Sequence, residues 1–270
     1  MARVRKGGNY RKNKDGKRDT YYWKAKEDGF RSRAAYKLFQ INEKHELIKP
    51  GDSIVDLGAA PGGWLEVAKQ LTDGHIIGVD LQRIAPIEGI ETIKGDMTSE
   101  RTIEKILKKV GEDGVEVVIC DAAPNLSGNW SLDHARSIDL TTCALECAIK
   151  ILKPGGHFVA KVFQGDMFDG FVHKLSRNFA FTKSYSPKAS RSQSAEIYVI
   201  GKKFLSAPLK KGNKFDVEIT EIGSDGDGVA TVDGFVVFVK DVELGDKVNI
   251  KITDVKPKFA FAEVLKKNTN

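Results

Sequence analysis

The sequence predicts an α/β domain built on a mainly parallel sheet with helices on both faces, followed by a small β-barrel. Between about residues 50 and 203, apolar runs of strand length alternate with amphipathic stretches of helix length. Strands separated by helices in this way indicate a parallel sheet. After about residue 206 the helical periodicity ends, and short apolar runs separated by glycines follow. Such short strands are typical of a small barrel of OB-like character.

The elements of the first domain follow from the spacing of its apolar residues. Residues 31–49 carry Ala, Leu, Phe and Ile at helical spacing, which predicts a helix beside the sheet. Strands are expected near residues 53–57, 75–80, 91–94, 115–121, 157–163, 180–186 and 195–202. Helices are expected near residues 63–72, 99–110, 134–152 and 168–178. In sheets of this kind, ligands bind at the carboxyl ends of the strands.

The chain is expected to have three parts. A basic N-terminal arm covers residues 1–27, the α/β domain covers 28–203, and the barrel covers 206–266. Strands of the barrel are expected at residues 215–222, 228–232, 235–239, 247–255 and 259–264. Because a barrel of this size serves many purposes, its fold alone says little about function.

The positive charge of the chain is concentrated in the arm. The net charge is +6, but residues 1–26 alone hold ten Lys and Arg against Asp15 and Asp19, which makes +8 there and −2 elsewhere. Aromatic residues are interleaved with these cations: Tyr10, Tyr21, Tyr22 and Trp23. Cations that bind phosphates and rings that stack on bases predict an arm that contacts RNA. The alternative is a solvated tail, which could still order on RNA.

Several classes of protein are excluded by composition. No apolar run approaches the ~20 residues of a membrane helix, and no signal-peptide core follows Met1. Three cysteines, Cys120, Cys143 and Cys147, are too few for a disulfide framework, which favours a reducing cytoplasm. The spacing of Cys143 and Cys147 has no matching Cys/His pair, so no metal site is expected.

A glycine-rich turn is the most informative segment, reading Asp56-Leu-Gly-Ala-Ala-Pro-Gly-Gly-Trp64 after an apolar strand and before an amphipathic helix. Glycines allow the backbone to approach a ligand closely. The glycine spacing does not match the G-x-G-x-x-G of dinucleotide sites, and Pro61 removes an N–H that a phosphate would use. A cofactor with adenosine and an amino-acid tail but no phosphates, S-adenosylmethionine, fits better.

Four aspartates follow or end the predicted strands of the sheet. They are Asp56, Asp80, Asp96 and Asp121. We expect them on one rim, where the carboxylate after the second strand can bind both ribose hydroxyls and the one after the third can accept the adenine amino group. Each alone could equally cap a helix or form a turn. Together with the glycine-rich turn they favour a nucleoside cofactor.

These residues, with several further motifs, closely resemble the FtsJ/RrmJ (RlmE) ribosomal RNA methyltransferases. The further motifs are Arg31-Ser-Arg-Ala-Ala-Tyr-Lys-Leu38, Asp121-Ala-Ala-Pro-Asn-Leu-Ser-Gly128, Leu152-Lys-Pro-Gly-Gly156, Val159-Ala-Lys-Val-Phe-Gln-Gly165 and Ser190-Arg-Ser-Gln-Ser-Ala-Glu-Ile-Tyr198. The resemblance covers about residues 28–203, and residues 206–266 look like a TRAM domain, an RNA-binding barrel. It implies a Rossmann-like S-adenosylmethionine-dependent methyltransferase fold and 2′-O-methylation of a uridine in large-subunit (23S-type) ribosomal RNA, presented on the assembled large subunit.

The resemblance also implies which residues act. Its catalytic Lys-Asp-Lys-Glu set falls on Lys37, Asp121, Lys161 and Glu196, with Lys161 as the proton acceptor. The cofactor-binding residues it implies, together with the rim aspartates, are Gly58, Gly62, Trp64, Asp80, Asp96 and Asp121. Trp64 could contact the cofactor or fill the seam between helix and sheet, and we expect the contact. Arg31 and Arg33 could cap a helix or bind RNA phosphates.

Lysines and carboxylates suit this reaction. A ribose 2′-hydroxyl attacks a methyl group well only when it is aligned and its proton is withdrawn. Lys161 can take that proton only when neutral. Burial and the Lys37 cation favour the neutral form, whereas Asp121 and Glu196 favour the charged form. The role expected of the two carboxylates is to orient the lysines and the hydroxyl.

Three other functions remain alternatives. A related enzyme could methylate tRNA or an mRNA cap, which locating the methylated nucleotide would reveal. A non-catalytic RNA-binding or assembly factor would have no need of the lysine–carboxylate set. A nicotinamide oxidoreductase would bind NAD in place of S-adenosylmethionine. Neither the oligomeric state nor the need for the barrel follows from the sequence.

Overall fold

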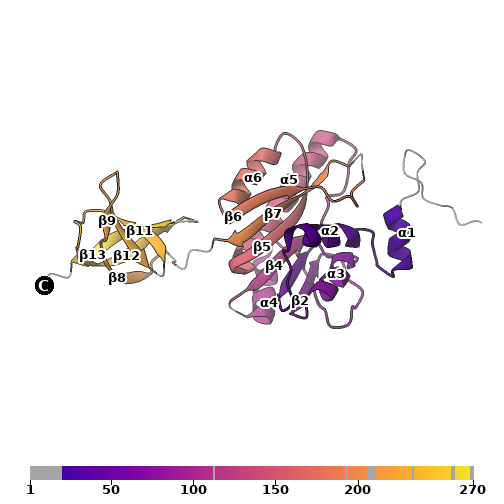
Figure 1. The fold of residues 1–270 in the computed structure, drawn as a ribbon, viewed down its shortest axis with the longest axis horizontal. Coiled ribbons are helices and arrows are strands. Elements are labelled where there is room, and N and C mark those ends of the chain that lie inside the picture. Colours follow the sequence, from indigo (N-terminus) through magenta and orange to yellow (C-terminus); the bar gives the residue numbers. More distant parts are fainter. Residues whose placement is uncertain are drawn as a thin grey trace, which may run out of the picture.

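The computed structural model describes residues 20–111, 113–191, 194–205, 209, 211–232, 234–256 and 259–267. These residues form two separate sheets, one of seven strands and one of six (Figure 1). In this part of the chain, no helix is both long and apolar enough to cross a membrane.

The larger sheet has the strand order β3-β2-β1-β4-β5-β7-β6. The order reverses between β1 and β4, which places the switch point of the fold there. All neighbouring strands run parallel except β7, which is antiparallel to both β5 and β6. The strands are β1 (Ile54–Leu57), β2 (Ile76–Asp80), β3 (Glu91–Lys94), β4 (Val115–Cys120), β5 (Leu152–Phe163), β6 (Phe179–Tyr185) and β7 (Glu196–Phe204). This confirms the predicted α/β fold class.

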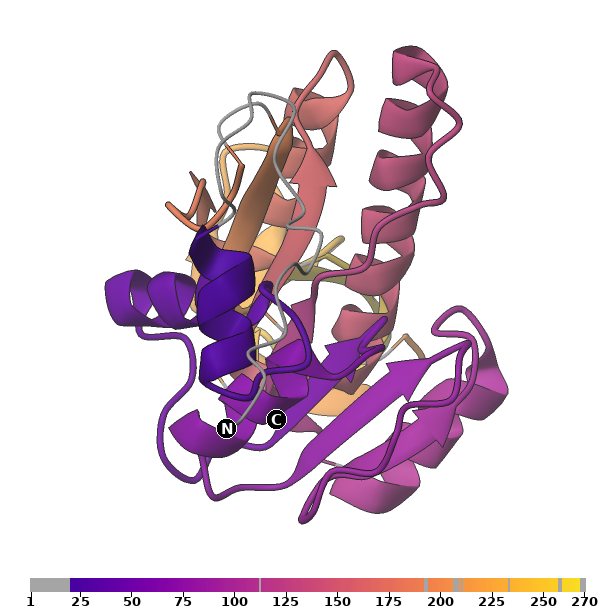
Figure 2. The same ribbon diagram turned by 90° about the vertical axis from the view of Figure 1, so that its right-hand side faces the viewer.

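Helices cover both faces of this sheet. They are α1 (Thr20–Glu27), α2 (Ala35–His45), α3 (Gly63–Leu71), α4 (Glu100–Val110), α5 (Trp130–Ile151) and α6 (Phe168–Ser176). One apolar core joins α2 and α3 to the sheet, and a second joins α4, α5 and α6 to the opposite face. Figure 2 shows α2 and α5 on opposite sides of the strands.

Two helices differ from the sequence-based prediction. The long helix α5 begins four residues early, at Trp130, because the Asn129 side chain caps it by accepting a hydrogen bond from the Leu132 N–H at 3.2 Å. The end of the predicted arm is the helix α1, whose Ala25 is buried against Tyr36 and Ala189. Apolar contact with α2 therefore orders residues that a charge pattern alone describes as a tail. The rest of the predicted arm, residues 1–19, lies outside the described residues.

The smaller sheet curls into the predicted C-terminal barrel. Its order is β8-β12-β13-β11-β10-β9, with all pairs antiparallel except β11 and β13. The strands are β8 (Lys214–Glu218), β9 (Glu221–Ile222), β10 (Gly228–Val232), β11 (Phe235–Val239), β12 (Lys247–Val255) and β13 (Phe259–Lys267). Their inward side chains, mostly valine, isoleucine and alanine, form a core of their own.

The prediction of one strand over residues 215–222 is wrong, because the segment divides into β8 and β9. The first part pairs with β12 and the second with β10. At the break, Ile219 is buried in the barrel core and the Thr220 N–H donates to the Val229 oxygen at 2.9 Å. The chain thus passes from one edge strand of the sheet, β8, to the other, β9.

Candidate active site

The glycine-rich turn between β1 and α3 is held against the neighbouring strands. The N–H groups of Gly58 and Ala59 donate to the Val79 oxygen at 2.8 and 3.1 Å. Gly58 has a φ of +71°, and a Cβ there would lie 2.5 Å from the Ala122 Cβ, so only glycine fits. The turn therefore brings the ends of β1, β2 and β4 into close contact.

Arg31 fixes the outer side of this turn. Its Nη1 donates to the oxygens of Ala85 at 2.7 Å and Pro61 at 3.2 Å, and its Nη2 donates to the Pro86 oxygen at 2.8 Å. Its Nε also pairs with Glu66 Oε1 at 3.0 Å. With this many protein acceptors, the guanidinium is a clamp between the turn and the segment after β2. The structure thus gives Arg31 a role that the sequence analysis did not consider.

Arg31→Ala should weaken ligand binding beside the turn. We expect the dissociation constant of a ligand bound there to rise about 5- to 50-fold, because loss of the clamp lets the turn move and displacements of ~1 Å are costly in such sites. Arg101→Ala, an exposed arginine on α4, is the matched control. Isothermal titration with both variants measures the effect, and equal affinities would show that the clamp is unimportant.

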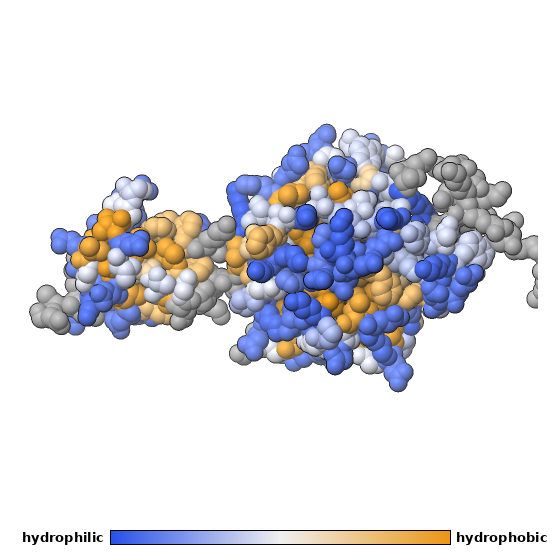
Figure 3. Space-filling model, viewed as in Figure 1, coloured by the Kyte–Doolittle hydropathy of each residue, from blue (hydrophilic) through white to orange (hydrophobic). Residues whose placement is uncertain are grey.

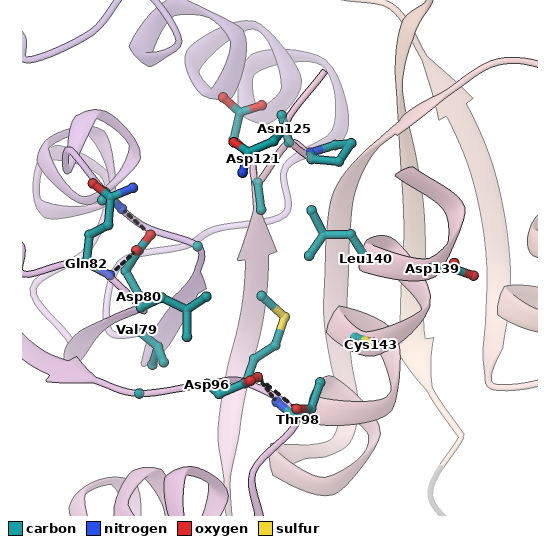
Figure 4. A pocket seen from close by; sticks show the side chains of 18 of the residues that line it. Val79, Asp80, Gln82, Asp96, Thr98, Asp121, Asn125, Asp139, Leu140 and Cys143 are labelled. Carbon is teal, nitrogen blue, oxygen red and sulfur yellow. Dashed lines mark hydrogen bonds between the residues drawn. The ribbon is translucent and has the colours of Figure 1, made fainter. Parts of the chain in front are cut away.

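A cavity of about 700 Å³ opens beside the turn. It lies among the ends of β1, β2, β3 and β4 and the side of α5, and Figure 4 shows Asp80, Asp96 and Asp121 around it. Val79, Met97, Leu140 and Cys143 are among the residues that supply its less polar lining. The volume lies within the ~300–1,000 Å³ usual for ligand sites. Apolar walls with a few convergent carboxylates fit an adenine ring with polar edges.

Two of the lining aspartates are already oriented by backbone groups. Asp80 accepts hydrogen bonds from the Ala60 N–H at 2.9 Å and the Gln82 N–H at 2.7 Å. Asp96 Oδ1 accepts from the N–H and the hydroxyl of Thr98, both at 2.8 Å. Because carboxylate oxygens have several acceptor sites, each can bind a ligand hydroxyl or amino group as well.

Asp56 corrects the expectation of four aspartates on one rim. Its side chain is 1 % exposed on β1 and does not line the cavity. Burial, and then the charges of Asp121 and Asp80, raise its pKa well above the ordinary value. Asp56 thus lies beneath the rim, where its surroundings favour the neutral form of the carboxyl. Sequence position alone placed it at a strand end without showing how deeply the strand is covered.

Lys161 on β5 and Asp121 after β4 form the centre of the site. The Lys161 Nζ donates to the Asp121 backbone oxygen at 2.7 Å and lies 3.2 Å from its Oδ1. Both lysines of the site are 7 % exposed. Asp121 also lines the cavity, so it joins the cofactor-sized space to the reactive amine.

Lys37 and Glu196 complete the cluster. The Lys37 Nζ on α2 binds Glu196 Oε2 at 2.8 Å, and Glu196 Oε1 lies 3.9 Å from the Lys161 Nζ. Burial alone would raise the pKa of Glu196, but the Lys37 and Lys161 charges and its hydrogen bonds outweigh burial and lower that pKa. The ionised carboxylate thus stands between two lysines. The structure brings together all four residues selected from the sequence.

Tyr198 is a member of the cluster that the sequence analysis missed. Its hydroxyl donates to Asp121 Oδ1 at 2.6 Å, and its ring centre lies 5.6 Å from the Lys37 Nζ. Burial, followed by the Asp121 charge, raises the pKa of Tyr198 well above its ordinary value, so the hydroxyl remains a donor. The available signal was strand alternation, since Tyr198 follows Glu196 by two and pairs in register with Lys161.

Trp64 fills the seam between helix and sheet. Its side chain is 3 % exposed, its Nε1 donates to the Ala34 oxygen at 2.9 Å, and its ring packs 5.7 Å from that of Tyr198. The indole is absent from the residues that line the cavity, as is Gly62. Both lie at the start of α3, where backbone N–H groups rather than side chains can meet a ligand.

Comparison with known proteins agrees with this geometry. A model of FtsJ-like methyltransferases matches residues 30–204, and a TRAM domain model matches residues 208–265. Ribosomal RNA large subunit methyltransferase E of Methanosarcina acetivorans is 69 % identical over 92 % of this chain and 91 % of its own. The protein of the same name from Halorubrum lacusprofundi is 46 % identical over 91 % of this chain and 93 % of its own.

A solved structure is similar as well. It comes from Plasmodium falciparum, was described provisionally as a ribosomal RNA methyltransferase, and is 28 % identical, with a TM-score of 0.59 over 66 % of this chain and 100 % of its own. The residues that line the cavity and the lysines beside it all lie within the part of the chain that matches this family. We conclude that this chain is a methyltransferase of the FtsJ-like family and carries a TRAM domain at its C-terminal end.

Proposed function

We propose that the protein transfers a methyl group from S-adenosylmethionine to the 2′-hydroxyl of a uridine in large-subunit ribosomal RNA. The observation that carries this proposal is the double role of Asp121, which lines the cofactor-sized cavity and also binds the Lys161 amine at 2.7 Å through its backbone oxygen. This contact supports Lys161 as the proton acceptor, because a methyl group and a hydroxyl would meet beside its amine. The relatives named ribosomal RNA large subunit methyltransferase E support the choice of RNA.

The donor fits the cavity through carboxylates and backbone groups. Asp80 would bind the ribose hydroxyls and Asp96 the adenine amino group, and both line the cavity. Gly58 lines the cavity and lets the backbone approach the donor, while Gly62 and Trp64 at the start of α3 would shape the turn beside the amino-acid tail. When bound, S-adenosylmethionine supplies an electrophilic methyl group. No clustered metal ligands occur among the described residues, and the proposal needs none.

The residues of the cluster would activate and align the hydroxyl. Lys161, in its neutral form, accepts the 2′-proton as the oxygen attacks. Asp121 and the Tyr198 hydroxyl hold the Lys161 amine in place through the contacts described above. Lys37 and Glu196 form the opposite side of the site and would orient the ribose. The chain's main task is therefore alignment and removal of one proton.

The rest of the chain would hold the RNA. We propose that the barrel over residues 206–266 is a separate RNA-binding unit, and that the basic arm contacts RNA next to the α/β domain. On the barrel, Phe238, Phe259 and Phe261 are half-buried and pack against one another with ring centres 5.4–6.0 Å apart. Figure 3 shows hydrophobic side chains on the barrel surface. Such rings can stack on unpaired bases.

Two measurements test this function. Purified protein should transfer labelled methyl from S-adenosylmethionine to large ribosomal subunits from a strain that lacks the enzyme. It should also be stabilised against heat by S-adenosylmethionine and not by NAD. Stabilisation by NAD alone would support an oxidoreductase. Transfer to tRNA or capped mRNA in place of large subunits would identify another RNA as the substrate.

A ribosomal RNA substrate would also place the protein in the cytoplasm.

Removal of residues 206–270 should weaken RNA binding and leave the chemistry intact. We expect the KM for RNA to rise at least about 10-fold, because loss of even two or three stacked bases at ~1–3 kcal/mol each is costly, with kcat nearly unchanged. The salt dependence of KM should become shallower as phosphate contacts are lost. Full-length Phe238→Ala/Phe261→Ala should show part of the same loss. A fall in kcat with constant KM would assign the barrel a role in catalysis.

A further inference from the structure

Trp130 is a large apolar side chain that stands at the surface beside the reactive cluster. It is the first residue of α5 and is 51 % exposed. Its indole lies nearly parallel to the rings of His134 and Phe163, with interplanar angles of 19° and 18° and ring centres 5.9 and 6.1 Å away. A half-exposed ring backed by two others is unusual for a solvated surface.

This ring stack lies next to the proposed catalytic residues, because Phe163 is close to both Lys161 and Glu196 in the sheet. Phe163 follows Lys161 by two on β5, and its partner across the ladder to β7 is Glu196. The Gln164 N–H then donates to the Ala195 oxygen at 2.9 Å, which continues the pairing beyond Phe163. Trp130 therefore lies over the strand ends that present Lys161 and Glu196.

The position of Trp130 is fixed by bonds from both neighbouring loops. The buried His134 accepts the Met167 N–H at 3.1 Å through its Nε2, which ties α5 to the loop after β5. A Cβ at Gly165 would lie 2.8 Å from the His134 ring, so that loop packs tightly on the stack. On the other side, Asp133 accepts hydrogen bonds from the N–H groups of Ser127 at 2.7 Å and Gly128 at 3.0 Å. These bonds fix the first turn of α5, which carries the Trp130 indole, in the absence of a ligand.

The same two loops carry further exposed apolar side chains. Leu126 precedes α5 and Met167 follows β5, and both are exposed, as is Leu132 in the first turn of α5. No other stretch of comparable length in the described parts of the chain gathers as many exposed large hydrophobic residues as 126–132. The mouth of the site is therefore apolar on the side of α5, in contrast to the lysines and carboxylates within.

We propose that Trp130 is a stacking platform for an unpaired base of the RNA next to the nucleotide that is methylated. This inference rests on the proposed function. To bring a 2′-hydroxyl to Lys161, the RNA must be single-stranded there, and its neighbouring bases then need a flat apolar surface. An indole with one face packed on protein offers such a surface to any base. Trp130 is a positioning residue and takes no part in proton transfer.

Steady-state kinetics of Trp130→Ala and Trp130→Phe test the proposal. A base stack contributes ~1–3 kcal/mol, which corresponds to an increase of about 5- to 150-fold in the KM for RNA in the alanine variant. The kcat and the KM for S-adenosylmethionine should stay within about twofold, and phenylalanine should recover much of the loss. Phe181→Ala, which removes an exposed aromatic side chain on the edge strand β6, away from the site, is the matched control. A KM for RNA in Trp130→Ala equal to that of Phe181→Ala would overturn the proposal.

Fluorescence gives a second test that does not depend on turnover or on the fold of the alanine variant. The chain has three tryptophans, of which Trp64 is buried and Trp23 lies in the arm proposed to contact RNA. In a Trp23→Phe protein, an RNA fragment that spans the methylated nucleotide should quench the fluorescence, and the further change Trp130→Phe should remove most of that quenching. Equal quenching in the two proteins would overturn the proposal even if methyl transfer is normal. If the wild-type protein transfers no methyl group to RNA, the proposed function fails, and the proposal for Trp130 fails with it.

Discussion

Lys161→Ala should reduce kcat for methyl transfer about 10²–10⁴-fold, the range expected for loss of a positioned proton acceptor. The Lys161 Nζ is the group that Asp121 holds at the mouth of the cavity, whereas the Lys37 Nζ is bound to Glu196 Oε2 at 2.8 Å. Affinity for S-adenosylmethionine should stay within a few-fold of wild type, since Lys161 does not line the cavity. Single-turnover kinetics with labelled donor measure the loss.

Two further variants separate proton transfer from structure. Lys161→Arg keeps the positive charge but cannot act as a base, and it should be nearly as inactive as the alanine variant. Lys183→Ala removes an exposed lysine on β6 and should be fully active. If Lys161→Arg kept most of its activity, Lys161 would act as a charge, and the assignment of the proton acceptor would be wrong.

Glu196→Ala should lower both stability and activity, because it leaves Lys37 buried without its partner. The loss of one member of a buried ion pair costs about 3–5 kcal/mol, and we expect about 2–3 kcal/mol here because the Glu196 side chain is 24 % exposed. Activity should fall ~10²-fold as Lys37 and the ribose lose their orientation. Denaturant unfolding and turnover measure the two effects. The double variant Lys37→Met/Glu196→Gln should recover much of the stability and none of the activity.

The same carboxylate should make stability depend on pH. Because the pKa of Glu196 in the folded protein lies below its ordinary value of 4.5, its ionised form stabilises the fold above that pH. This contribution is lost as the pH falls through the lower, folded pKa. The wild type should therefore lose stability more steeply than Glu196→Gln between about pH 5 and the acid limit of folding. Parallel curves for the two proteins would contradict the ion-pair account.

The fold was largely predictable because the strands of both sheets show as local patterns of apolar residues in the sequence. Alternating and continuous apolar runs placed the strands of the first sheet, and glycine-separated runs placed the barrel. Two of the differences have tertiary causes. The strand over 215–222 divides because Thr220 changes partner strands, and α1 forms because Ala25 finds a buried site against Tyr36. Neither contact leaves a local signal in the sequence.

The charged residues of the site could be predicted from the sequence, but the residues that hold them in position could not. The family resemblance identified Lys37, Asp121, Lys161 and Glu196. Tyr198 and Arg31 instead act through register and through backbone oxygens that are distant in sequence. Trp64 shows the limit of residue type as a guide. A tryptophan after a glycine-rich turn suits either a ligand or a core, and only the packing against Ala34 and Tyr198 shows that this ring belongs to the core.

The central claim is that Lys161 and its neighbours methylate a ribose oxygen of large-subunit RNA. Labelled large subunits should be digested to nucleosides after incubation with wild-type protein or Lys161→Ala, and the products separated by mass spectrometry. We expect the label in 2′-O-methyluridine with the wild type and in no nucleoside with the variant. Label on a base, or equal labelling by the two proteins, would contradict the account.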